Sequence, residues 1–97
     1  MAFLIPIDGV PREETPGRGG TFTVSELERF VGGYLQAIGL DDGRVMFVNE
    51  DGRRDGLAVN ATATELAAMS GLAPGESIAG PAIVCTRAEI AEDHEDE

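Results

Sequence analysis

Several residue types are missing or nearly missing from this chain of 97 residues, which has no lysine, no tryptophan, one cysteine and one histidine. The single Cys85 excludes an intrachain disulfide and a metal site built on several thiolates. His94 stands in a run of acidic residues, which argues against a histidine-based catalytic triad. We therefore expect no cofactor and no resident metal.

Long apolar runs are also missing. The longest, 2–7 and 78–85, each contain a proline and fall far short of the roughly 20 residues of a membrane helix. No cationic segment precedes the first run, so it lacks the pattern of a secretory signal. These absences predict a cytoplasmic protein, of a bacterial or archaeal host, with no membrane association.

The charge is strongly acidic, with 18 Asp and Glu residues against seven arginines and a net charge of −11. Residues 88–97 carry six of the acids and no arginine, which leaves −5 on residues 1–87. We predict one domain over 1–87 and a disordered acidic tail over 88–97. Direct nucleic-acid binding is not expected, because Lys and Arg supply the affinity for phosphates. An acidic nucleic-acid mimic that inhibits a DNA-binding host protein is an alternative, although acids also simply keep small proteins soluble.

Two short helices are indicated by the spacing Thr-x-x-Glu, which occurs at 23–26 and 62–65 and is typical of a capping box. The first helix is expected over 24–31, where apolar residues recur at helical spacing and a glycine pair follows. In the second helix, Leu66 and Met69, with Leu72 as a further candidate, are expected to form the apolar stripe.

The other apolar segments predict strands, and a loop rich in proline, glycine and charge, 10–20, is expected to be flexible. The predicted strands are 3–7, 34–40, 45–48, 57–59 and 78–86. The order βαβββαβ predicts an α+β fold with a small mixed or antiparallel sheet. A ferredoxin-like (split βαβ) arrangement, with both helices on one sheet face, matches this order most simply; a β-grasp-like or other mixed sheet is the alternative.

Polar residues where strands meet turns or helices are the candidate ligand-binding residues. Tyr34 could stack on a ligand, Asn49 could donate hydrogen bonds, and Arg53 or Arg54 could hold a phosphate. The full predicted set is Tyr34, Asn49, Glu50, Arg53, Asn60 and Thr62. The alternative is that the Asn and Thr side chains only cap helices and turns.

Catalytic residues are harder to find. Acidic pairs occur at 13–14, 41–42 and 50–51, all in predicted loops or turns, where carboxylates are ordinarily solvated. A small carboxylate-dependent hydrolase using Glu50 with Asp51 or Asp41 is therefore a minor alternative. The glycine-rich 17–20 lacks the lysine of a phosphate-binding loop. We predict that the chain is not an enzyme.

One stretch, 27–67, resembles the family catalogued as domain of unknown function 3846. Its features are Gly-Gly-Tyr at the end of a capped helix (32–34), a hairpin, the turn Asn-Glu-x-Gly (49–52) and Asn60 shortly before a second helix. The closing IAGPAIV is similar to the family's last strand, with Pro81 where an acidic or polar residue is expected. Members are small proteins of bacteria and their phages, and the family name implies no activity.

The sequence thus predicts a small acidic, non-enzymatic binding protein of phage or mobile-element type. It would sequester a small nucleotide-like ligand or bind a host protein. Self-association through an exposed sheet edge stays open.

Overall fold

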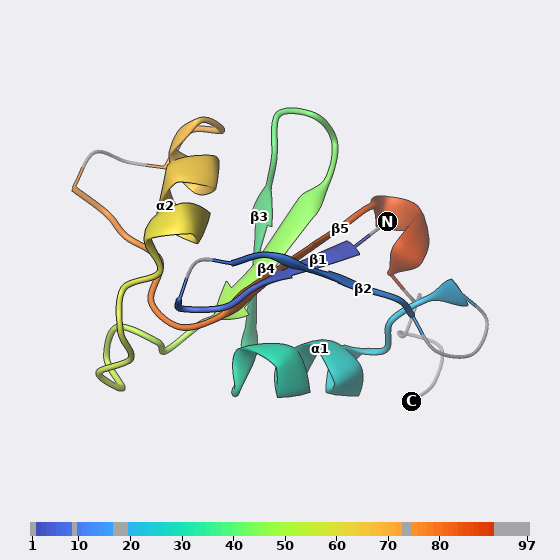
Figure 1. Ribbon diagram of the computed structural model, residues 1–97, viewed down its shortest axis with the longest axis horizontal. Coiled ribbons are helices and arrows are strands. Elements are labelled where there is room, and N and C mark those ends of the chain that lie inside the picture. The colour runs from blue at the N-terminus through green and yellow to red at the C-terminus, as the bar shows by residue number, and fades with distance from the viewer. Residues whose placement is uncertain (1, 9, 17–19, 73–74, 91–97) are drawn as a thin grey trace.

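The computed structural model describes residues 2–8, 10–16, 20–72 and 75–90. Its five strands form one sheet in the order β2-β1-β5-β4-β3, and every pair of neighbours is antiparallel (Figure 1). The elements are β1 (Ala2–Ile5), β2 (Arg12–Glu14), α1 (Val24–Val31), β3 (Leu35–Gly39), β4 (Val45–Asn49), α2 (Ala61–Ala68), β5 (Ala82–Cys85) and a 3₁₀ helix, η2 (Arg87–Glu89).

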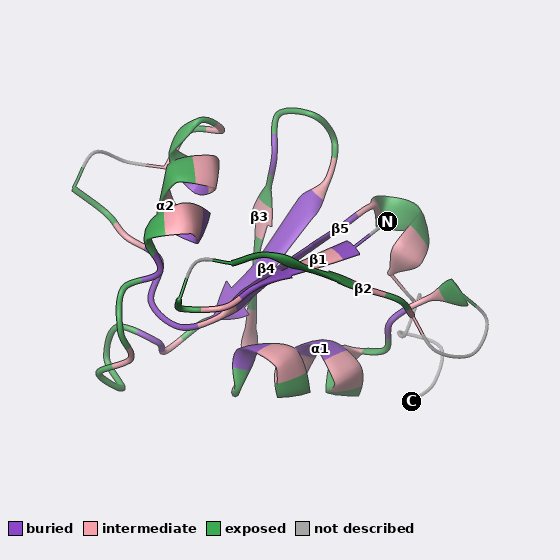
Figure 2. Ribbon diagram, viewed as in Figure 1, coloured by how far each residue is buried: buried purple, intermediate pink, exposed green. Residues whose placement is uncertain are grey.

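The central strands β4 and β5 are buried at every position, as Figure 2 shows for β4. Successive side chains of a strand point to opposite faces. Val45, Phe47 and Ile83 therefore pack on the side of α1, whereas Met46 and Val84 pack on the side of α2. Because both faces are apolar, each needs a cover, and one helix lies on each side of the sheet.

This arrangement confirms the α+β class, the antiparallel sheet and the two short helices. It differs from the ferredoxin-like (split βαβ) arrangement in the placing of the helices, because α1 and α2 cover opposite faces of the sheet instead of one. The continuous apolar runs of β4 and β5 are the physical reason, since a sheet with one solvated face would show alternation instead.

The segment 10–20 was expected to be a loop, but it contains β2. This strand pairs with β1 through Ala2↔Glu14, Phe3↔Glu13 and Leu4↔Arg12. A strand at the sheet edge needs no apolar alternation, and charged residues at an edge discourage pairing with other chains. The sequence therefore carries no strand signal here. Residues 17–19 of the predicted loop lie outside the described residues.

The predicted strand 57–59 is also not formed. It forms one isolated bridge, Val59↔Ala79, and neither residue belongs to a strand of the sheet. The chain is instead held by turns, with the Leu57 N–H donating to the Gly52 carbonyl over 2.9 Å. Leu57 lies against Gly80, where a Cβ atom would come within 2.7 Å of it.

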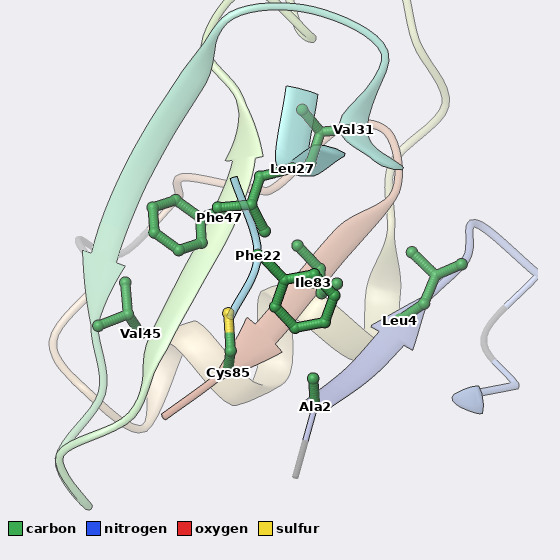
Figure 3. Close-up of a cluster of buried hydrophobic side chains, with 9 residues drawn as sticks. All are labelled: Ala2, Leu4, Phe22, Leu27, Val31, Val45, Phe47, Ile83 and Cys85. Atoms are coloured by element: carbon green, nitrogen blue, oxygen red, sulfur yellow. The ribbon is translucent and has the colours of Figure 1, made fainter. Parts of the chain in front are cut away.

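Helix α1 covers one face of the sheet, and Figure 3 shows the nine side chains of the core on this side, with Leu27 and Val31 from α1 itself. The predicted capping box is present, because the Thr23 hydroxyl accepts from the Glu26 N–H and the Glu26 carboxylate accepts from the Thr23 N–H. The helix buries Leu27 and Val31 and ends at Gly32, whose φ of 81° is left-handed. The sequence predicted these limits correctly.

The domain continues beyond the predicted boundary at residue 87. The Phe22 N–H donates to the Glu89 carbonyl over 2.7 Å, and Ile90 forms a parallel bridge with Phe22 and packs against the core. Residues 88–90 therefore belong to the fold and not to the tail. Residues 91–97 lie outside the described residues, so disorder there stays a prediction.

We expect a chain ending at residue 87 to be less stable than one ending at residue 90. The shorter chain loses the half-buried Ile90 side chain and the hydrogen bond to Phe22, a loss on the order of 1–3 kcal/mol. Urea unfolding of the two truncated chains measures the difference. Equal free energies of unfolding would show that the segment 88–90 does not support the core.

The thiol of Cys85 is free and buried. Burial, with a smaller contribution from the negative charge of Glu89, raises the pKa of Cys85 from 9.0 to about 11. A raised pKa in the folded state stabilises the fold at low pH, and this stabilisation is lost as pH rises from about 9 through about 11. Wild type should therefore lose more stability than Cys85→Ala over this range. If the free energies of unfolding of wild type and Cys85→Ala change with pH in the same way, this prediction is wrong.

Candidate functional site

The face of the sheet beside α2 carries an open groove of about 330 Å³ with a mainly apolar lining. Phe3, Ile5 and Val84 contribute from the sheet, and Leu66 and Met69 contribute from α2. The remaining lining residues are Pro11, Arg44, Thr62 and Glu65. We call this space, with these nine residues, the α2 groove.

The groove exists because α2 meets the sheet through its smallest side chains. Ala63 and Ala67 are its buried residues, whereas Leu66 is half-buried and Met69 is 75% exposed. The predicted apolar stripe of Leu66 and Met69 is therefore not the buried face of the helix. An alanine face brings the helix backbone close to the sheet, and the longer side chains are left beside the contact.

Arg44 lies at the rim of the groove, held by Asp42 across the tight turn between β3 and β4. Its Nε and a terminal nitrogen each lie 2.7 Å from Oδ2 of Asp42. The Arg44 backbone N–H also donates to Asp42 over 3.0 Å, and this bond, more than the guanidinium, lowers the pKa of Asp42. The guanidinium is thus already paired.

A smaller hollow of about 210 Å³ lies against the end of α2 and shares Arg44, Leu66 and Met69 with the α2 groove. The Asp41 N–H donates to the Ser70 hydroxyl over 2.9 Å and ties the turn 41–44 to the end of α2. The rim of the α2 groove therefore carries the paired guanidinium of Arg44 together with acidic side chains, whereas the floor of the groove is uncharged.

The start of α2 is fixed by Asn60, whose side chain is completely buried. Its Nδ2 donates to the carbonyls of Ile5 (2.8 Å) and Gly80 (3.0 Å), and its Oδ1 accepts from the Ala63 N–H (3.0 Å). One amide thus joins the end of β1, the segment before β5 and the first turn of α2. Asn60 is the N-cap of α2, so the cap lies two residues before Thr62, the position that the capping-box spacing predicted.

Asn49 is used in a similar way at the end of β4. Its Nδ2 donates to the Val31 carbonyl over 3.3 Å, and its Oδ1 accepts from the Asp51 N–H over 2.8 Å. Asn49 therefore connects the end of α1 with the turn that follows β4.

The six sequence-predicted residues occupy separate places. Thr62 lines the α2 groove, whereas Tyr34 is 71% exposed and adjoins Glu50 through a backbone hydrogen bond at the far end of the β3–β4 pair. Asn49 is buried close to that end, Asn60 is buried beneath α2, and Arg53 is exposed in the turn 50–56. The structure brings Tyr34, Asn49 and Glu50 together and leaves Thr62 elsewhere.

The carboxylates of the hydrolase alternative are also spread out. Asp41 follows β3 and Glu50 follows β4, so they lie at opposite ends of an antiparallel pair. Asp51 is paired with Arg54 over 2.6 Å. Within 2–8, 10–16, 20–72 and 75–90, no group of three or more His, Cys, Asp or Glu side chains is placed to hold a metal ion.

Sequence reasoning missed the apolar lining of the groove, because Phe3, Ile5, Leu66 and Val84 read as ordinary core residues. The available signal was the composition of α2, in which alanine is frequent at 61–68 and large apolar residues are few. A helix with an alanine face cannot fill the space over a sheet on its own.

Residues that carry the family resemblance lie at contacts within the fold. A Cβ atom on Gly33 would lie 2.7 Å from Nδ2 of Asn49, and one on Gly52 would collide with the Ala79 carbonyl oxygen. Asn60 holds Gly80 through its amide. These motif residues therefore allow close approach between elements.

Together these features define a small α+β domain in which an antiparallel sheet lies between two helices and one face carries an open apolar groove. Sequence comparison gives the family, because the model of Domain of unknown function (DUF3846) matches residues 2–96. The chain belongs to this family, as its motifs indicated. No curated protein and no solved structure matches it. In the part of the chain that the structure describes, no helix has the length and apolar character needed to cross a membrane.

We expect Asn60→Ala to destabilise the protein by about 3 kcal/mol or more, because it leaves two buried carbonyls and one helix N–H without partners. Asn49→Ala is the matched control, since it removes one 3.3 Å bond and one turn bond and should cost less. Chemical unfolding of both variants tests the order. A larger loss in Asn49→Ala would contradict the central role of Asn60.

Proposed function

We propose that this chain is a non-enzymatic binding protein that seats an apolar side chain of a partner protein in the α2 groove. The observation that carries the proposal is the groove itself, with an apolar floor and the 75% exposed Met69 at its edge. Exposed apolar surface is costly in water, and a flexible Met side chain adapts to different partners.

The charges around the groove favour a protein partner over a nucleotide. A phosphate needs an available cation, but Arg44 is paired with Asp42, and Arg53 and Arg54 lie in the turn 50–56 and not in the groove. Glu65 at the rim and the net charge of −11 favour a partner that carries Arg or Lys beside its apolar residue.

The proposal also covers the cellular location and the kind of protein. We place the partner in the cytoplasm of a bacterial or archaeal host and the chain among phage or mobile-element proteins, as the family resemblance implies. A small nucleotide-like ligand held by Tyr34, Asn49 and Arg53 is the competing occupant. Binding experiments with peptides and with nucleotides distinguish the two occupants.

The test selects peptides from a random displayed library against the wild-type chain. We expect enriched peptides to contain Leu, Phe or Met flanked by Arg or Lys, and to shift the NMR amide signals of Leu66, Met69 and Val84. Met69→Glu should weaken their binding by about tenfold or more, because it places a charge where an apolar group is seated.

Val59→Glu is the matched control, since Val59 is also an exposed apolar residue (58%), lies outside the groove and undergoes the same change of charge. Equal weakening by both variants would mean that overall charge, and not the groove, governs binding. Shifts confined to Tyr34, Asn49 and the turn 50–56 on addition of nucleotides, with no peptide bound in the groove, would replace the proposal with the small-ligand function.

A further inference from the structure

The two edges of the sheet differ in their protection against pairing with another chain. The edge strand β2 has three residues, all of them charged: Arg12, Glu13 and Glu14. The opposite edge, β3, has five residues and the sequence LQAIG, with no charge and no proline. Natural proteins ordinarily protect an edge strand by charge, proline, a bulge or shortness, and β3 has none of these.

The hydrogen bonds to β4 determine which backbone groups of β3 point outward. The Glu50 N–H donates to the Tyr34 carbonyl, and the Leu40 N–H donates to the Arg44 carbonyl, each over 2.8 Å. Bonding to β4 alternates along an antiparallel strand, so residues 34, 36, 38 and 40 face β4. The N–H and C=O groups of Leu35, Ala37 and Gly39 therefore point away from the sheet.

We propose that β3 pairs antiparallel with β3 of a second copy of this chain, about a twofold axis at Ala37. In this register Ala37 meets Ala37, and Leu35 of one copy meets Gly39 of the other. The outward groups of the two strands then form about six main-chain hydrogen bonds. The result is a continuous sheet of ten strands from two chains.

The side chains fit this register. Of the three residues whose backbone groups point away from the sheet, Leu35 has the largest side chain, and it lies across from a glycine. The small Ala37 lies at the twofold axis. On the other face Gln36 lies across from Ile38. The exposed Tyr34 comes to lie across from Leu40 of the second copy, which gives its ring an apolar neighbour.

The acidic charge does not oppose this pairing. The acidic residues that flank the strand are Asp41 and Asp42 beyond one end and Glu50, whose N–H bonds to Tyr34, at the other. Continuing the register places the two aspartates toward the glycine pair 32–33 of the second copy, so the paired strands bring no like charges directly opposite each other. The surface is separate from the α2 groove, and the proposal is independent of the function proposed for that groove.

The experiment compares three chains by light scattering after size exclusion. Wild type should have twice the monomer mass of 10.2 kDa. Ala37→Lys and Ala37→Glu should each be monomeric, because identical charges then meet at the axis. An equimolar mixture of the two variants should recover the dimer mass, because the charges are opposite. Val59→Lys, the same change as in Ala37→Lys from a small apolar residue to a cation but outside both β3 and the α2 groove, should leave the wild-type mass unchanged.

Amide hydrogen exchange gives a readout that does not depend on the variants. The amides of Leu35, Ala37 and Gly39 should be protected in wild type, with protection that falls on dilution, whereas those of Gln36 and Ile38 should stay protected at all concentrations. A monomeric wild type, a dimer that persists in Ala37→Lys, or unprotected outward amides in the dimer would each overturn the proposal.

Discussion

The buried amide of Asn60 is the interaction on which the rest of the structure depends. It bonds to the carbonyls of Ile5 and Gly80 and to the first turn of α2, three segments that are distant in the sequence. Its backbone also takes part, since its N–H donates to the Ile78 carbonyl and its carbonyl accepts from Thr64. A helix of eight residues has little stability of its own, so α2 needs this fixed start. The position of the α2 groove follows from the same bonds.

The two helices cover their faces of the sheet with side chains of different size. On one side, α1 places Leu27 and Val31 against the sheet and, with Phe22, fills the space above it. On the other side, α2 presents alanines, and part of the sheet face is left open. A tight contact through small side chains thus fixes the helix and leaves a space next to it. The open groove and the stability of this face come from the same choice of residues.

Local signals in the sequence were sufficient for the parts of the fold that local chemistry determines. The capping box at Thr23, the left-handed Gly32 and the β3–β4 hairpin all follow from residues close together in the chain. The strand β2 and the packing of Ile90 depend on partners far away, β1 and Phe22, and no local pattern reports them. The candidate site was missed for a similar reason. The sequence does not distinguish an apolar residue that lines a groove from one that lies in the core. The difference depends on whether the side chains packed opposite are large enough to fill the space.

The position of β5 between β1 and β4 determines when the sheet can form during synthesis of the chain. Ile5 pairs with Ala82 and Phe47 pairs with Ile83, so the last strand joins two parts of the sheet that do not pair with each other. A nascent chain that lacks residues 82–85 has a β3–β4 hairpin and a β1–β2 pair, but no strand that pairs with both, and it exposes apolar surface of each. The sheet is therefore completed only after residues 82–85 have been synthesised. Until then these apolar surfaces and unpaired strand edges are exposed, which is the condition under which folding chains aggregate.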